Sequence, residues 1–126
     1  MTIPMIRFSE TPTEKRQIGR DAEDASLAFL QQQGLKFVTR NFNCRAGEID
    51  LIMMDGDMLV FIEVRKRKNR HFGGAAFSVT PAKQRKIVKT AQFYLQRDRT
   101  MPPCRFDVMA WDGAQSQWLK NAIETI

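Results

Sequence analysis

Apolar residues recur along the chain with two different periods, and these periods divide it into helices and strands. From about Thr13 they return every three to four residues, as on one face of a helix, until Gly34, a typical C-terminal stop. A second helix is expected after Thr80, because threonine caps helix N-termini and Pro81 suits the first helical position. Residues 1–12 follow no clear period, so we expect a flexible arm ahead of a single domain at 13–126.

The remaining apolar segments are typical of strands. In the first of them, Phe37, Val38 and Phe42 are the candidate core residues. The second and third flank a Gly-Asp turn at 55–57, which predicts a β-hairpin. The order of elements predicts an α/β domain in which a mixed β-sheet is flanked by helices. The expected strands are 36–42, 47–54, 58–65, 105–111 and 117–123.

Charge is distributed unevenly along the 126 residues, which carry a formal net charge of +6. Residues 65–99 contain eleven lysines and arginines against one aspartate, so this stretch carries +10 and the rest of the chain −4. A contiguous basic stretch is typical of a surface that contacts the phosphates of a nucleic acid.

Membrane insertion and secretion are not expected from this sequence. No run approaches the roughly 18 apolar residues of a membrane helix, and Pro4 interrupts the short apolar run at the N-terminus. Cys44 and Cys104 lack the spacing of metal ligands, which favours reduced thiols. We therefore expect a cytoplasmic protein.

The predicted hairpin brings two carboxylates together. The two registers that the 55–57 turn allows place Asp50 either directly opposite Glu63 or diagonal to it, on the same face and within roughly 5–8 Å. Opposed carboxylates repel each other unless a cation lies between them, and Mg²⁺ binds one or two carboxylates while keeping several waters. The alternatives are a solvated surface pair, or a pair neutralised by Arg65 or Arg45.

Four sequence features follow one another along the chain: Gly47-Glu48-Ile49-Asp50-Leu51-Ile52, Val60-Phe61-Ile62-Glu63-Val64-Arg65, Lys83 and Arg105-Phe106-Asp107-Val108. In this order and spacing they resemble the YraN-like family of small bacterial proteins. That family is in turn similar to the PD-(D/E)xK nucleases, particularly archaeal Holliday-junction resolvases. The resemblance covers about residues 15–110 and implies a restriction-endonuclease-like fold.

The resemblance implies a role for each acidic residue. Asp50 and Glu63 match its metal ligands, and Glu23 matches a helix glutamate directed at the same metal, although a solvated carboxylate is the alternative reading of Glu23. Arg65 stands where the nuclease signature has lysine. Arginine stays protonated and cannot act as a base, but it can stabilise charge on a phosphate. Lys83 is the nearest candidate for a replacement ammonium group.

Together these observations predict an endonuclease that depends on Mg²⁺ or Mn²⁺ and cleaves branched or structured nucleic acid, which we expect to be DNA. Two alternatives stay open: a nuclease-fold binding module that has lost cleavage, and a protein-interaction module. Resolvases of this fold act as symmetric dimers, so the resemblance also implies a homodimer. The expected catalytic residues are Asp50, Glu63, Arg65 and Glu23, and the expected nucleic-acid contacts are Arg67, Lys68, Arg70, Lys83 and Lys86.

Three residues outside this set carry weaker signals. Asp107 is motif-like, but it reads equally well as a structural partner of Arg45 or Lys83. Trp111 and Trp118 are expected to pack on the sheet or to form a dimer face.

Overall fold

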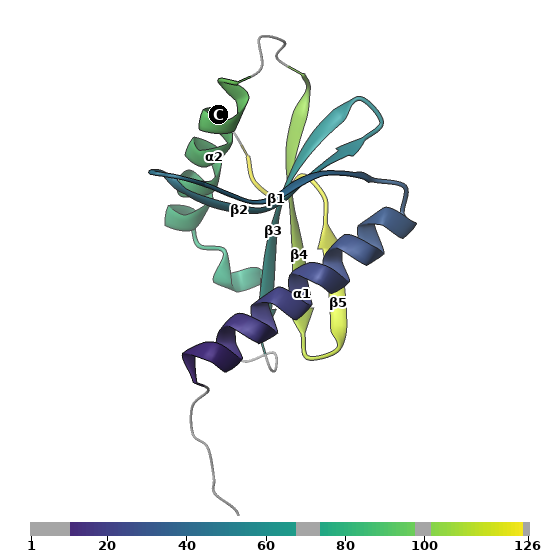
Figure 1. Cartoon of the computed structure of the whole chain (residues 1–126), viewed down its shortest axis with the longest axis vertical. Coiled ribbons are helices and arrows are strands. Elements are labelled where there is room, and N and C mark those ends of the chain that lie inside the picture. The colour runs from purple at the N-terminus through teal and green to yellow at the C-terminus, as the bar shows by residue number, and fades with distance from the viewer. Residues whose placement is uncertain (1–10, 68–73, 98–101, 125–126) are drawn as a thin grey trace, which may run out of the picture.

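A computed structural model describes residues 11–67, 74–97 and 102–124 (Figure 1). Most of the expected N-terminal arm therefore lies outside the described residues. The elements are α1 (Pro12–Gln32), β1 (Lys36–Cys44), β2 (Gly47–Asp55), β3 (Met58–Arg67), the short 3₁₀ helix η2 (Ala76–Ser78), α2 (Pro81–Leu95), β4 (Cys104–Asp112) and β5 (Gln115–Leu119).

The five strands form one mixed sheet in the order β1-β2-β3-β4-β5. Neighbouring strands are antiparallel except β3 and β4, which are parallel because α2 carries the chain back between them. The two helices lie on opposite faces of the sheet (Figure 1). The predicted mixed α/β architecture is confirmed.

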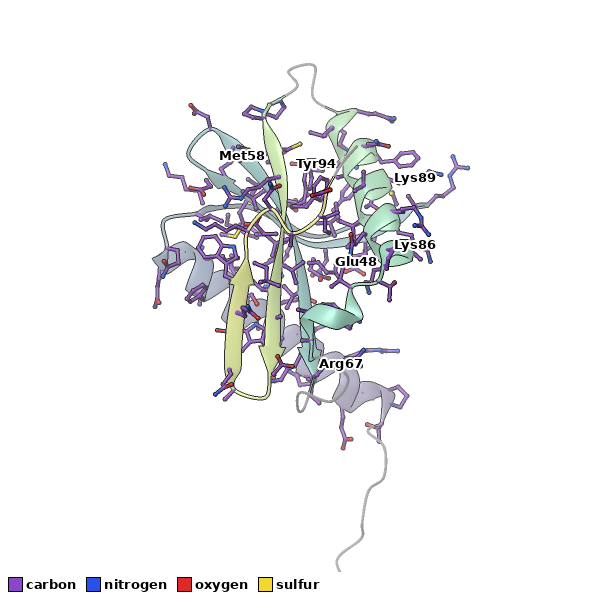
Figure 2. All side chains as sticks on the ribbon, turned by 180° about the vertical axis from the view of Figure 1, so that it is seen from behind. Glu48, Met58, Arg67, Lys86, Lys89 and Tyr94 are labelled. Carbon is purple, nitrogen blue, oxygen red and sulfur yellow. The ribbon has the colours of Figure 1, made fainter. Side chains whose placement is uncertain are left out.

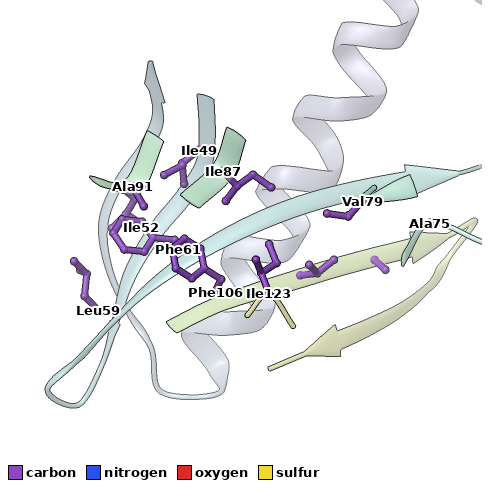
Figure 3. Packing of buried hydrophobic residues seen from close by; sticks show 12 residues of the cluster. Ile49, Ile52, Leu59, Phe61, Ala75, Val79, Ile87, Ala91, Phe106 and Ile123 are labelled. Atoms are coloured by element: carbon purple, nitrogen blue, oxygen red, sulfur yellow. The ribbon is translucent and has the colours of Figure 1, made fainter. Parts of the chain in front are cut away.

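Each helix covers its own hydrophobic core. On the α1 side the buried residues include Leu30, Leu51 and Ile62. On the α2 side Ile87 and Ala91 pack with residues of β2, β3 and β4, as Figure 3 shows. Because both faces of the central strands are covered, β2 and β3 read as nearly continuous apolar runs.

The helix ends follow the capping rules. Thr11 caps α1, and its side chain and that of Glu14 form a reciprocal capping box, so α1 begins one residue before the expected Thr13. The hydroxyl of Thr80 accepts a hydrogen bond from the Lys83 amide, which confirms the predicted start of α2. Neither helix, within the part of the chain described, has the length and apolarity to cross a bilayer.

Two strand predictions are wrong in detail. Phe37 and Val38, expected in the core, are 44% and 39% exposed, because β1 is an edge strand with an irregular register between Phe37 and Thr39. The last strand is Gln115–Leu119 rather than 117–123. Ile123 lies beyond the end of this strand and is buried in the α2-side core.

The β2–β3 hairpin has the register that places Asp50 opposite Glu63. Its two-residue turn, in which Gly56 adopts a φ of 60°, pairs Asp55 with Met58. The regular pairing of β2 with β3 ends at Leu51↔Ile62. Beyond this point β2 stays paired with β1 and β3 with β4, so the two strands part at Asp50 and Glu63.

Candidate functional site

Asp50 and Glu63 line one pocket at the point where β2 and β3 part. An Asp50 carboxylate oxygen, Oδ2, accepts a hydrogen bond of 2.7 Å from the Val64 amide, taking the place of a strand carbonyl. Glu63 shares the α2 side of β3 with Phe61 and is only 6% exposed. The predicted juxtaposition of the two carboxylates on one face is therefore present.

The pocket has a volume of about 400 Å³ and lies between α2 and the parted strands. Its floor is acidic and its rim is basic. Gly47 allows β2 to pass close to α2, because a Cβ atom there would lie 3.1 Å from the Thr90 hydroxyl and the backbone has a φ of 151°. The lining residues are Gly47, Glu48, Asp50, Glu63, Val64, Arg65, Thr80, Ala82, Lys83, Lys86, Ile87 and Thr90.

The two carboxylates are destabilised as anions. Burial, followed by the charge of Glu63, raises the pKa of Asp50 from its ordinary value of 3.8 to about 8, although the hydrogen bond from Val64 opposes the shift. Burial also raises the pKa of Glu63, while Lys83 and Arg65 act in the opposite direction. The pair therefore tends to hold a proton unless another positive charge enters the pocket.

Two cations approach Glu63 from different elements. Lys83 Nζ lies 3.5 Å and Arg65 Nη1 lies 3.7 Å from Glu63 Oε1. Arg65 is held in this position by Ser78, whose hydroxyl accepts a 2.8 Å hydrogen bond from Arg65 Nε. Lys83, the candidate for a replacement ammonium group, thus lies beside Glu63, and Ser78 is a residue of the site that the sequence did not indicate.

Glu23 lies at the edge of this site and is not among the residues that line the pocket. Asn41 Nδ2 donates a 2.8 Å hydrogen bond to Glu23 Oε1 and a 3.0 Å hydrogen bond to Glu48 Oε1. Arg40 Nη2 lies 3.5 Å from the same Glu23 oxygen. The charges of Glu23 and Glu48 contribute to the raised pKa of Asp50, so both carboxylates are electrostatically part of the site.

The expected nucleic-acid contacts divide into three groups. Lys83 and Lys86 line the pocket. Arg67 is exposed near the end of β3, away from Lys86 and Glu48 and outside the pocket lining (Figure 2). Lys68 and Arg70 lie outside the described residues.

Asp107 has a structural role, but not with the expected partners. It is fully buried and accepts hydrogen bonds from Arg105 Nε, from Trp118 Nε1 and from the Asn121 amide, rather than from Arg45 or Lys83. Trp118 also packs on the α1 side of the sheet, as expected for a packing residue.

Three carboxylates line the pocket, but only Asp50 and Glu63 lie buried side by side, and they do not make a complete set of metal ligands. Among residues 11–67, 74–97 and 102–124, no three histidine, cysteine, aspartate or glutamate side chains are grouped so that they could hold a metal ion. Two oxygen ligands suit Mg²⁺, which keeps several waters, better than Zn²⁺, which takes three or four protein ligands.

A five-stranded mixed sheet between two helices is consistent with the restriction-endonuclease-like class of α/β proteins. The chain belongs to the family described as "Uncharacterised protein family UPF0102". The family matches residues 22–111, a range that contains Asp50, Glu63, Arg65 and Lys83. UPF0102 is the YraN-like family, so the family predicted from the motifs is confirmed.

Three relatives illustrate how closely the family members agree. The chain is 54% identical to a UPF0102 protein of Herminiimonas arsenicoxydans over 119 residues, covering 94% of this chain and 96% of the relative. It is 54% identical to a UPF0102 protein of Janthinobacterium sp. (strain Marseille) over 117 residues, covering 93% and 95%. A UPF0102 protein of Pseudomonas fluorescens (strain Pf0-1) is 48% identical over 113 residues, covering 86% and 94%.

Proposed function

We propose that the protein is a divalent-metal-dependent nuclease that hydrolyses phosphodiester bonds of branched or structured DNA. The observation that carries this proposal is the pairing of Asp50 and Glu63 in one pocket whose rim holds Arg65, Lys83 and Lys86. The acidic pair suits a metal ion, and the basic rim suits the phosphate on which it would act.

The residues present fit a hard divalent cation. Asp50 and Glu63 offer oxygen ligands, and the pKa of Asp50 is raised because burial and the charge of Glu63 leave its anion undercompensated. Mg²⁺ or Mn²⁺ would be held by these two carboxylates. The negative charge of Glu23, which acts on Asp50 from outside the pocket, would add to the attraction for the ion. When bound, the ion supplies Lewis-acid charge and an activated water for hydrolysis.

The cationic residues have separate tasks in this proposal. Lys83 and Lys86 line the pocket and bind the non-bridging oxygens of a phosphate. Arg65 uses Nε to hold Ser78, which fixes the orientation of its guanidinium group beside Glu63. In that position the guanidinium group stabilises negative charge that develops on the phosphate, but it does not remove a proton.

The test combines cleavage with metal binding. Wild type is expected to cut a branched DNA substrate with Mg²⁺ or Mn²⁺, and Asp50→Asn is expected to lose at least about 100-fold in rate. Isothermal titration should show Mn²⁺ binding to wild type and much weaker binding to Asp50→Asn. Asp57→Asn changes an exposed aspartate in the turn of the same hairpin and is the matched control. Identical Mn²⁺ isotherms for wild type and Asp50→Asn would refute the metal site.

One observation favours a second candidate, a binding module that does not cleave. Lys83 and Arg65 already lie within 4 Å of Glu63 and supply part of the charge that a metal would supply. Such a module would bind DNA without turnover in every divalent ion. Arg65→Lys would restore the lysine of the nuclease signature. If wild type binds DNA without cleaving it, this variant is expected to cleave.

A further inference from the structure

Helix α2 is cationic on both of its flanks. Its fifteen residues, Pro81–Leu95, include four lysines and arginines and not one carboxylate. Lys83 and Lys86 line the acidic pocket on one flank. Arg85 and Lys89 line a second hollow of about 380 Å³, on the flank that meets Ile123.

The ridge between these two flanks faces away from the protein. The buried residues of α2 are Ile87, Thr90 and Ala91, which pack toward the sheet. Lys86 and Lys89 project from the opposite, outer side of the helix (Figure 2). The outer side of the helix therefore carries positive charge, and each of these two lysines also borders the hollow on its own flank.

We propose that α2 lies in the major groove of a B-form DNA duplex, with each flank facing one of the two phosphate backbones. An α-helix with its side chains is about 10–12 Å wide, which matches a major groove of about 12 Å but not a minor groove of about 6 Å. The major groove of A-form RNA is deep and narrow, and a single strand offers only one backbone. Double-stranded DNA is therefore the partner that engages both flanks.

This inference rests on the proposed function and gives the two flanks unequal roles. The backbone beside Lys83 and Lys86 would lie next to Asp50 and Glu63. The opposite backbone, beside Arg85 and Lys89, would be held without meeting the acidic pair. One protein molecule would thus hold both DNA strands and bring only one of them to the acidic pair.

Binding without metal tests this geometry. Fluorescence anisotropy in EDTA would compare a DNA duplex of about 20 base pairs, one of its strands, and an RNA duplex of the same sequence at several salt concentrations. Each flank is removed separately, as Lys83→Gln/Lys86→Gln and as Arg85→Gln/Lys89→Gln. The matched control, Lys36→Gln/Lys120→Gln, removes the same charge from exposed positions outside α2.

We expect wild type to bind the DNA duplex at least about 10-fold more tightly than either other ligand. Each flank variant should lose about 10-fold in affinity for the DNA duplex, and its plot of log K against log salt should flatten by about 2, while the control stays within about 3-fold of wild type. The proposal is overturned if the Arg85→Gln/Lys89→Gln variant behaves like the control, or if single-stranded DNA or duplex RNA binds equally well. Because the assay contains no metal, its result is independent of the Mn²⁺ titration that tests the acidic pair.

Discussion

At the scale of single residues, the raised pKa of Asp50 makes stability depend on pH. Its pKa rises from 3.8 to about 8 on folding, mainly through burial. The folded state therefore keeps a proton that the unfolded chain releases, and the free energy of unfolding falls as the pH rises from about 4 to about 8. The limiting slope for one proton is about 1.4 kcal/mol per pH unit. Asp50→Asn removes this titration, so the variant should lose less stability than wild type over that range.

Urea denaturation in EDTA at a series of pH values measures this difference. The control is Asp57→Asn, which alters an exposed aspartate in the same hairpin and should follow the wild-type curve. A constant difference between wild type and Asp50→Asn across the whole range would mean that Asp50 does not titrate there.

The carboxylate pair itself could be predicted from the sequence, whereas its surroundings could not. Strand alternation and a two-residue turn determine which side Asp50 and Glu63 share, and both are local properties. The position of Glu23 depends instead on Asn41, which adopts a left-handed backbone with a φ of 54°. Nothing in the spacing of residues indicates that conformation. Ser78 was missed for a similar reason, because η2 meets Arg65 only in the folded chain.

At the scale of elements, Asn41 connects three of them at the edge of the site. It belongs to β1, and its amide donates to Glu23 on α1 and to Glu48 on β2. Asn41→Ala removes both hydrogen bonds and places alanine in a left-handed conformation, so we expect a loss of about 1–2 kcal/mol in the free energy of unfolding. Asn41→Gly, which tolerates that backbone, should lose less.

A second asparagine separates the two contributions. Asn121 has a similar φ of 52° and lies outside this network, so Asn121→Ala reports mainly the backbone penalty. Urea denaturation of both alanine variants should show the larger loss for Asn41→Ala. Equal losses would show that the bridge to Glu23 and Glu48 contributes nothing to stability.

The strands differ in how well their patterns predicted them. The β2–β3 hairpin was predicted correctly because both strands lie inside the sheet and a glycine marks the turn, but its register was left open between two alternatives, and the structure has the one that pairs Asp55 with Met58. Two of the three core residues predicted in β1 are wrong, because an edge strand with an irregular register exposes Phe37 and Val38, whereas Phe42 packs against the α2-side core. The end of β5 was misplaced because Ile123 is buried without being in a strand.

At the scale of the whole molecule, the site exists because β2 and β3 separate at one end of their pairing. Pairing of β2 with β3 stops at Leu51↔Ile62, while β1 and β4 continue to hold the outer edges of the two strands. The backbone N–H of Val64 then donates its hydrogen bond to the Asp50 carboxylate, in place of a carbonyl of the neighbouring strand. The same opening brings carboxylates from both strands under α2, whose lysines provide the opposite charge.

A divalent ion bound in this opening should stabilise the entire fold. Asp50 and Glu63 come from separate strands, so an ion held by both binds the folded chain and not the unfolded one. At 100 times its Kd the ion adds about 2.7 kcal/mol, which corresponds to a rise in Tm on the order of 10 °C for a chain of this size. Thermal unfolding with MnCl₂ should show this rise for wild type and for Asp57→Asn, but not for Asp50→Asn. NaCl at equal ionic strength accounts for general screening of charge. An equal rise in Asp50→Asn would place the ion elsewhere on the molecule, and the acidic pair would then have no part in binding it.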